Sequence, residues 1–247
     1  MSDFKVAVAQ IPSLKGDVSV NIIRHLLAIE KAAELGIKYI VFPELSLTGY
    51  EPELALELSF KIDDPRLQPL IDTAITHKIH VVVGVPLIEL DVVYIASVTI
   101  SDLGIVTYYR KMHLHEGENA YFTAGIKHHF LNIDGFQIAN AICADTNHVI
   151  HPQGCYELGA DIYMAGVLIG ESGYQSDTSL LKAYSKNFGL LVAVANHNAP
   201  TGNWLPIGKS AIWYKNQLIV SANETQNALV IAEKQTIGWC GYVVELQ

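Results

Sequence analysis

The stretch HFLNIDGFQIANAICAD (residues 129–145) decides the fold class, because it joins a hairpin to the start of a β-α-β unit. Asp134-Gly135 separates two apolar runs and is a strong two-residue hairpin signal. The second run, 136–142, is followed by a helical pattern over 149–159 and another strand over 161–165. Antiparallel pairing in the hairpin and parallel pairing across the helix together predict a mixed sheet.

Strand and helix patterns alternate in the same way along the rest of the chain. A second hairpin is expected between 92–100 and 105–109, because Asp102 and Gly104 supply turn residues. We see no linker, repeat or low-complexity segment, and therefore predict one α/β domain over residues 1–247. Further strands are expected at 5–10, 39–42, 81–85 and 190–196, further helices at 18–35, 66–78 and 177–188, and a final strand meander at 209–214, 217–222 and 227–233.

Composition limits the partners of this chain. Of its 247 residues, 50% are hydrophobic and 17% are charged, so a substantial core is available. The formal net charge of −9, without any basic stripe, argues against nucleic acid as a partner. There is no apolar run of about 18 residues, the length that spans a membrane, and we expect no membrane association.

The first residues and the cysteines indicate the compartment. The start, MSDFKVAVAQIPSL, carries charges at Asp3 and Lys5 and has no continuous apolar signal core. The three cysteines, Cys143, Cys155 and Cys240, form no CxxC motif, and an odd number suits a reducing compartment. We therefore expect a cytoplasmic protein.

Three chemically useful side chains each follow a separate apolar run. Glu44 follows 39–42, Lys111 closes the strand that begins at 105, and Cys143 follows 136–142. Strand ends converge on one rim of a sheet, where a carboxylate can act as base, an ammonium can stabilise an oxyanion and a thiol can attack. Before a helix, the thiol could also be activated by the helix N-terminus. Taken singly, each residue fits a structural role: a turn acid, a solvated strand end and a small buried hydrophobe.

These residues lie in segments that resemble the nitrilase superfamily of carbon–nitrogen hydrolases. The resemblance covers nearly the whole chain, with the blocks in the family's order and spacing. The blocks are VFPELSLTGY (41–50), YYRKMHLHEGENAYFTAG (108–125), IANAICAD (138–145), ELGADIYM (157–164), AYSKNFGLLVAVANHNAPTG (183–202) and GKSAIW (208–213).

The resemblance implies a four-layer α-β-β-α sandwich with mixed sheets and a Glu-Lys-Cys triad. Carried over by position, Glu44 is the general base, Lys111 the oxyanion stabiliser and Cys143 the nucleophile. The family also implies a homodimer or larger homo-oligomer, in which the sandwiches associate face to face. No metal and no cofactor are expected.

The resemblance implies further roles around the triad. Glu118 matches the family's second glutamate, which orients the substrate and the lysine. Glu116 is a competing candidate, but Glu118 has the matching distance to Gly125. The backbone N–H of Ala144 would share the oxyanion hole with Lys111, and Asn147 stands where the family often has an arginine that binds a substrate carboxylate.

Three departures from the family pattern bear on the substrate. Strict nitrile hydrolases typically carry tryptophan after the nucleophile, so Ala144 speaks for amides over nitriles. Asn147 puts carboxylate recognition at that position in doubt. The segment AGVLIGESG (165–173) has no transferable counterpart. We therefore expect a carbon–nitrogen hydrolase of the amidase-like branch, acting with water on a small amide or N-carbamoyl compound and not on peptide bonds.

Three alternatives remain open at this point. A true nitrile hydrolase would use the same triad. A metal-dependent hydrolase could use His113 and His115 together with His148, His151 or His197. A non-catalytic binding module on the same fold would not need all three triad residues.

Overall fold

The computed structural model describes residues 4–246. The expected domain also includes residues 1–3 and 247, which lie outside the described residues, as does the charge at Asp3. The helices are α1 (Val18–Glu34), α2 (Gln68–His77), α3 (Ile150–Glu157) and α4 (Glu171–Asn187), with 3-10 helices at Pro52–Leu54, Pro65–Leu67, Glu118–Ala120 and Cys143–Asn147.

The larger sheet has seven strands in the order β13-β12-β1-β2-β3-β4-β5. Strands β1, β2 and β3 run parallel, and the other neighbouring pairs are antiparallel. The bounds are β1 (Lys5–Gln10), β2 (Tyr39–Val41), β3 (His80–Glu89), β4 (Val92–Ile100), β5 (Val106–Arg110), β12 (Ala228–Lys234) and β13 (Trp239–Glu245).

The second sheet has six strands in the order β11-β10-β9-β8-β7-β6. Here β7, β8 and β9 are parallel and the remaining pairs are antiparallel, so both sheets are mixed, as predicted. The bounds are β6 (Phe130–Ile133), β7 (Phe136–Ile142), β8 (Ile162–Val167), β9 (Leu191–Asn196), β10 (Ala211–Tyr214) and β11 (Gln217–Ser221).

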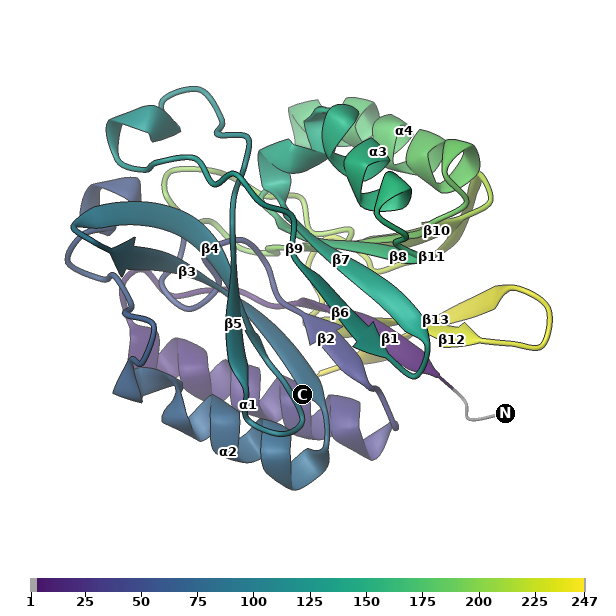
Figure 1. The fold of residues 1–247 in the computed structure, drawn as a ribbon, viewed down its shortest axis with the longest axis horizontal. Helices are drawn as coiled ribbons and strands as arrows, with labels where there is room; N and C mark the ends of the chain where they lie inside the picture. Colours follow the sequence, from purple (N-terminus) through teal and green to yellow (C-terminus); the bar gives the residue numbers. More distant parts are fainter. Residues whose placement is uncertain (1–3, 247) are drawn as a thin grey trace.

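The two sheets pack face to face between two layers of helices (Figure 1). Helices α1 and α2 cover the seven-stranded sheet, and α3 and α4 cover the six-stranded sheet. Asp17 caps the N-terminus of helix α1, because its side chain accepts a hydrogen bond from the Val20 N–H, and the helix ends at Glu34, shortly before Gly36. This arrangement confirms the predicted four-layer sandwich.

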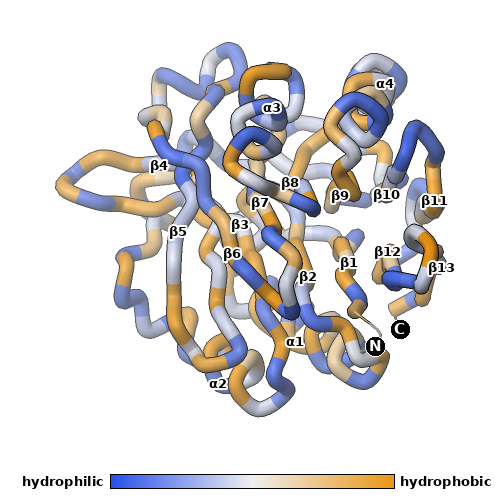
Figure 2. The backbone as a smooth tube through the Cα atoms, turned by 45° about the vertical axis from the view of Figure 1, so that its right-hand side comes forward, coloured by the Kyte–Doolittle hydropathy of each residue, from blue (hydrophilic) through white to orange (hydrophobic). Residues whose placement is uncertain are grey.

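Alternation along the strands explains the layering. In β1, Val6 and Val8 join a core between the sheets, whereas Ala7 and Ala9 join the core beneath α1. Successive side chains of a strand point to opposite faces, so a strand buried on both faces is apolar throughout. In Figure 2, orange and blue alternate along the helices, because each helix buries only one face.

Two sequence predictions need correction. The last three runs do not form a meander, because β10 pairs with β11 in one sheet while β12 pairs with β1 in the other. Helix α4 begins at Glu171 and not at 177. Gly173 and two serines in its first turns are poor helix formers and obscured the start. Strand β13 was not predicted.

Among residues 4–246, the longest apolar helical stretch falls short of what crossing a membrane requires.

Candidate active site

Glu44 lies on a segment held closely between the two sheets. A side chain at Gly84 of β3 would place its Cβ 2.3 Å from the Leu45 nitrogen, and one at Gly166 of β8 would lie 2.5 Å from the Phe42 oxygen. Only glycine allows this approach from both sides. The two glycines therefore fix the backbone that carries Glu44 where β2 ends.

Lys111 follows β5 and its ammonium lies between two carboxylates. Its Nζ donates to Glu44 Oε1 at 2.7 Å and to the two oxygens of Glu118 at 2.8 and 2.9 Å. All three side chains are almost completely buried. Burial lowers the pKa of Lys111, but the carboxylates outweigh it and raise the pKa overall, so the lysine remains charged.

Glu118 is held in place by two further donors. The Tyr50 hydroxyl donates to its Oε1 at 2.8 Å, and the His115 N–H donates to its Oε2 at 2.7 Å. Glu116, the competing candidate, is exposed and does not line the cavity that Cys143 lines. The structure thus brings Glu118 to Lys111. Tyr50 was not predicted as a site residue, although it ends the family-like block over 41–50.

Cys143 stands at a strained turn directly after β7. Its φ is +40°, a conformation that a residue with a side chain rarely adopts. The turn continues as a 3-10 helix of five residues, Cys143–Asn147, and the expected α-helix follows as α3. Burial and the nearby Glu44 carboxylate raise the thiol pKa well above its ordinary value. A thiol with a raised pKa stays protonated at neutral pH and becomes a nucleophile only when a base takes its proton.

Glu44 has the properties of that base. Burial raises its pKa to about 7, against the opposing effect of Lys111. Its Oε1 accepts from Lys111, but its buried Oε2 has no hydrogen-bond partner among the described residues. A carboxylate with a free oxygen and a pKa near neutrality can accept and return a proton at physiological pH.

Asp145 connects the cysteine turn to the segment after Lys111. Its buried carboxylate accepts from the backbone N–H groups of Ile142, Met112 and His113, at 3.0, 3.2 and 2.8 Å. It also accepts from the Tyr109 hydroxyl at 2.6 Å. These bonds fix the segment after Lys111 relative to the turn that carries Cys143. Sequence reasoning treated Asp145 only as a residue of the turn.

Cys143, Glu44 and Glu118 line one cavity of about 830 Å³. Ala144 and Asn147, the other two predicted site residues, also line it. Further residues of the wall come from the segment before α4, from α4 and from the loop before β10, and include Leu168, Glu171, Asp177, Asn203 and Trp204. The predicted residues therefore gather at one cavity, although they come from both sheets.

The five histidines of the metal alternative do not form a single group. His115 lines the cavity, whereas His197 is buried beneath it and contacts the Glu44 carbonyl at 2.8 Å. His113 and His148 stack on each other, with ring centroids 4.3 Å apart, on the segments joined by Asp145. His151 lies beside them, with its ring centroid 5.9 Å from that of His113, so these three histidines form one group that does not line the cavity.

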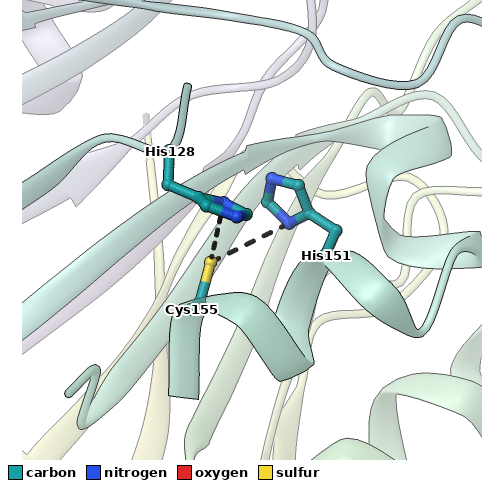
Figure 3. A group of neighbouring side chains, drawn as sticks. All are labelled: His128, His151 and Cys155. Carbon is teal, nitrogen blue, oxygen red and sulfur yellow. Dashed lines mark hydrogen bonds between the residues drawn. The ribbon is translucent and has the colours of Figure 1, made fainter. Parts of the chain in front are cut away.

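One group of three donors does exist among residues 4–246: His128, His151 and Cys155 (Figure 3). Their ligand atoms lie within 4.8 Å of one another, but both ring nitrogens of His151 form hydrogen bonds with the Tyr109 and Tyr163 hydroxyls. Burial raises the pKa of the Cys155 thiol to about 12. None of the three lines the cavity. Hydrogen bonding accounts for this cluster, which gives the metal alternative no donor set at the cavity.

Comparison with known proteins places this site in a family. The carbon-nitrogen hydrolase family matches residues 5–237. The chain therefore belongs to the carbon–nitrogen hydrolase family, which confirms the resemblance.

Individual relatives match parts of this chain. A glutamine-dependent NAD(+) synthetase of Thermotoga maritima is 29% identical over 197 residues, 74% of this chain and 34% of that protein. An (R)-stereoselective amidase of Pseudomonas sp. is 27% identical over 159 residues, 64% of this chain and 58% of that protein. The chain thus spans about a third of the first relative and somewhat more than half of the second.

Solved structures show the same fold. A mutant of the amidase from Nesterenkonia sp. AN1, in complex with butyramide, superimposes with a TM-score of 0.86 at 22% identity. The superposition covers 94% of this chain and 90% of that one. Another structure of the same amidase carries an acetamide moiety on its active-site cysteine, also with a TM-score of 0.86 and the same coverage.

Proposed function

We propose that this chain hydrolyses a small amide or N-carbamoyl compound through a thioester on Cys143. One observation carries the proposal: Cys143 and Glu44, which has one unpaired carboxylate oxygen, line the same cavity, and the buried ammonium of Lys111 binds Glu44. A nucleophile, a base and a positive charge at one cavity are the parts that acyl transfer requires.

Acylation begins with proton transfer from the Cys143 thiol to Glu44. The sulfur attacks the amide carbon, and the negative charge that develops on the oxygen is stabilised by Lys111 and the Ala144 N–H. Collapse of this intermediate breaks the carbon–nitrogen bond. The leaving nitrogen takes the proton held by Glu44 and departs as ammonia or an amine, which leaves a thioester.

Deacylation uses the same groups in the reverse sense. Glu44 accepts a proton from water, and the resulting hydroxide adds to the thioester carbon. Lys111 again stabilises the oxyanion. The carbon–sulfur bond then breaks, Glu44 returns its proton to the Cys143 sulfur, and the carboxylic acid leaves. Glu118 fixes Lys111 in this cycle through the contacts at 2.8 and 2.9 Å.

The small side chain of Ala144 favours amides over nitriles, and the relatives include a stereoselective amidase. A nitrilase of Pyrococcus abyssi is 32% identical, but only over 101 residues, 39% of this chain. Nitrile hydrolysis on the same triad is therefore the second candidate. A non-catalytic binding role is disfavoured, because a binding module does not need a buried base beside a strained thiol.

An ammonia-release screen of aliphatic amides, N-carbamoyl compounds and nitriles tests the proposal. Glutamine belongs in the panel because of the glutamine-dependent relative. We expect amide or carbamoyl turnover that Cys143→Ala abolishes, while Cys240→Ala, which changes an exposed thiol, serves as the matched control. Nitrile turnover far above amide turnover would favour the second candidate, and release that persists in Cys143→Ala would remove the thiol mechanism.

We also propose a homodimer or larger homo-oligomer in the cytoplasm. Exposed apolar side chains on α3, Ile150 and Tyr156, together with Leu158 just after it, support association through this helix layer. All three cysteines are unpaired, which suits a reducing compartment. Light scattering at micromolar concentration tests the first proposal, and a monomeric mass would contradict it.

A further inference from the structure

The cavity wall carries two carboxylates that the catalytic cycle does not use. Glu44 and Glu118 both bind Lys111, but Glu171 and Asp177 also line the wall and form no ion pair within residues 4–246. The cavity is a ligand site independently of these acids, since Cys143 lines it together with Glu44, whose buried Oε2 has no hydrogen-bond partner among the described residues.

Acidic residues are common at the start of a helix because they stabilise the helix dipole, but this explains only Glu171 and not Asp177. Glu171 is the first residue of α4 and interacts favourably with the helix dipole there. Asp177 lies in the second turn, where that effect has faded. It is half-buried over Gly173, and burial raises its pKa, against smaller opposing effects of Ser176 and His115.

Positive charge is scarce around this wall. Among the described residues no lysine or arginine lines the cavity, and its one basic side chain is His115. Lys209 influences Glu171 from outside the cavity, but its ammonium pairs with Glu224 at 2.8 Å. Asn147, at the position where the family resemblance leads us to expect an arginine, is neutral.

The surface next to this cavity is also negatively charged. A second cavity of about 310 Å³ shares Tyr50, Glu118 and Trp204 with the first and is also lined by Glu53 and Glu116, both exposed. Its one cation is Lys15, which pairs with Glu51 at 3.0 Å. Clustered like charges around a concave site concentrate oppositely charged solutes near it.

From this arrangement we infer that the substrate carries a cationic group, an ammonium or guanidinium, at the end remote from the scissile amide. Asp177 and Glu171 accept its hydrogen bonds, and the half-exposed ring of Trp204 offers an aromatic face to the same charge. A cavity of about 830 Å³ has room for a chain well beyond acetamide or butyramide.

This inference rests on the proposed function and names its substrate class. We expect amides that end in a carboxylate to bind poorly, because their negative charge would lie beside Asp177 and Glu171. A matched series of three amides tests this assignment: hexanamide, the ω-amino derivative of pentanamide, and the monoamide of glutaric acid. The first two have similar length and differ in terminal charge.

We expect kcat/KM for the cationic amide to exceed that for hexanamide by about tenfold, and the anionic amide to be the poorest of the three. Asp177→Asn should remove most of this preference by raising KM for the cationic amide, and Glu171→Gln should have a smaller effect in the same direction. Asp72→Asn, an exposed aspartate on α2, is the matched control. Raising the salt concentration should weaken the preference in the wild type.

A binding measurement separates recognition from chemistry. With Cys143→Ala, calorimetry should show tighter binding of the cationic amide than of hexanamide, and Asp177→Asn in that background should abolish the difference. Equal turnover and equal binding of the two amides would overturn the inference and leave the proposed function standing. Turnover of no amide by the wild type would overturn the proposed function, and the inference with it.

Discussion

Replacing Lys111 with methionine removes the charge on which the whole site depends. The lysine ammonium contacts three carboxylate oxygens, and the side chains of Lys111, Glu44 and Glu118 are 0%, 1% and 2% exposed. Methionine keeps the apolar stem but supplies no donor. The variant therefore tests the proposed oxyanion role and the electrostatic balance of the site together.

The expected losses are large in both respects. Removing one oxyanion donor typically lowers the rate by about 10²–10³. Removing one partner of a buried ion pair typically costs about 3–5 kcal/mol of stability, because the remaining charge stays buried without compensation. Glu118 retains its bonds from Tyr50 and the His115 N–H, whereas Glu44 keeps no donor, so most of the cost arises at Glu44.

The cost should depend on pH with a definite sign. The pKa of Glu44 is already raised from 4.5 to about 7, and loss of the neighbouring cation raises it further. A carboxyl with a raised folded pKa gains stability as the pH falls from that value toward the unfolded value of 4.5. The free-energy difference between variant and wild type should therefore shrink by about 1–2 kcal/mol between pH 8 and pH 5.5.

Urea denaturation at both pH values, followed by tryptophan fluorescence, measures the stability, and single-turnover kinetics measure the chemistry. Lys15→Met is the matched control, since Lys15 pairs with Glu51 at 3.0 Å but is 69% exposed. We expect it to change stability by less than about 1 kcal/mol. A folded Lys111→Met protein with near wild-type turnover, or a destabilisation independent of pH, would refute the reasoning.

Three further changes probe the rest of the site. Glu44→Gln should lower kcat/KM by about a hundredfold or more. In the wild type, activity should decrease as the pH is lowered through about 7, because protonated Glu44 cannot accept a proton, and the variant should lack this decrease. The pH profiles of both proteins check this. Intact-mass spectrometry during turnover should find a substrate-sized adduct on Cys143, and an adduct on Cys155 or Cys240 would contradict the site. Asp145→Ala should destabilise the fold by about 3 kcal/mol or more, because several buried donors lose their acceptor, and an unchanged urea midpoint would show that the network is dispensable.

Local pattern was enough to predict most strands and helices, because each buries a recognisable face. The mixed character of the sheets also followed from local signals, since a hairpin and a β-α-β unit require different pairing. The predicted meander over 209–233 was wrong because an apolar run does not specify which strand it pairs with. Strand β12 pairs with β1, which lies more than 200 residues earlier in the chain. Strand β13 was missed because Gly241 interrupts a short run.

Part of the site could be read from strand ends. Glu44, Lys111 and Cys143 each follow an apolar run, and the sheets bring these ends to one place. The residues that support these three could not be predicted in this way. Tyr50 forms a hydrogen bond with Glu118, 68 residues later in the chain, and Asp145 accepts a hydrogen bond from the segment after Lys111. Contacts of this kind depend on how the two sheets are stacked, which no single stretch of sequence contains.

The features that make this site reactive each carry a cost in folding free energy. Cys143 adopts a strained backbone conformation, and Glu44 is buried with one oxygen unpaired. A sequence selected only for stability would relieve both. Strain and uncompensated polarity persist where the surrounding structure fixes them, here through Gly84, Gly166 and Asp145. Their meeting at one cavity is therefore a physical argument for catalysis that does not depend on the family.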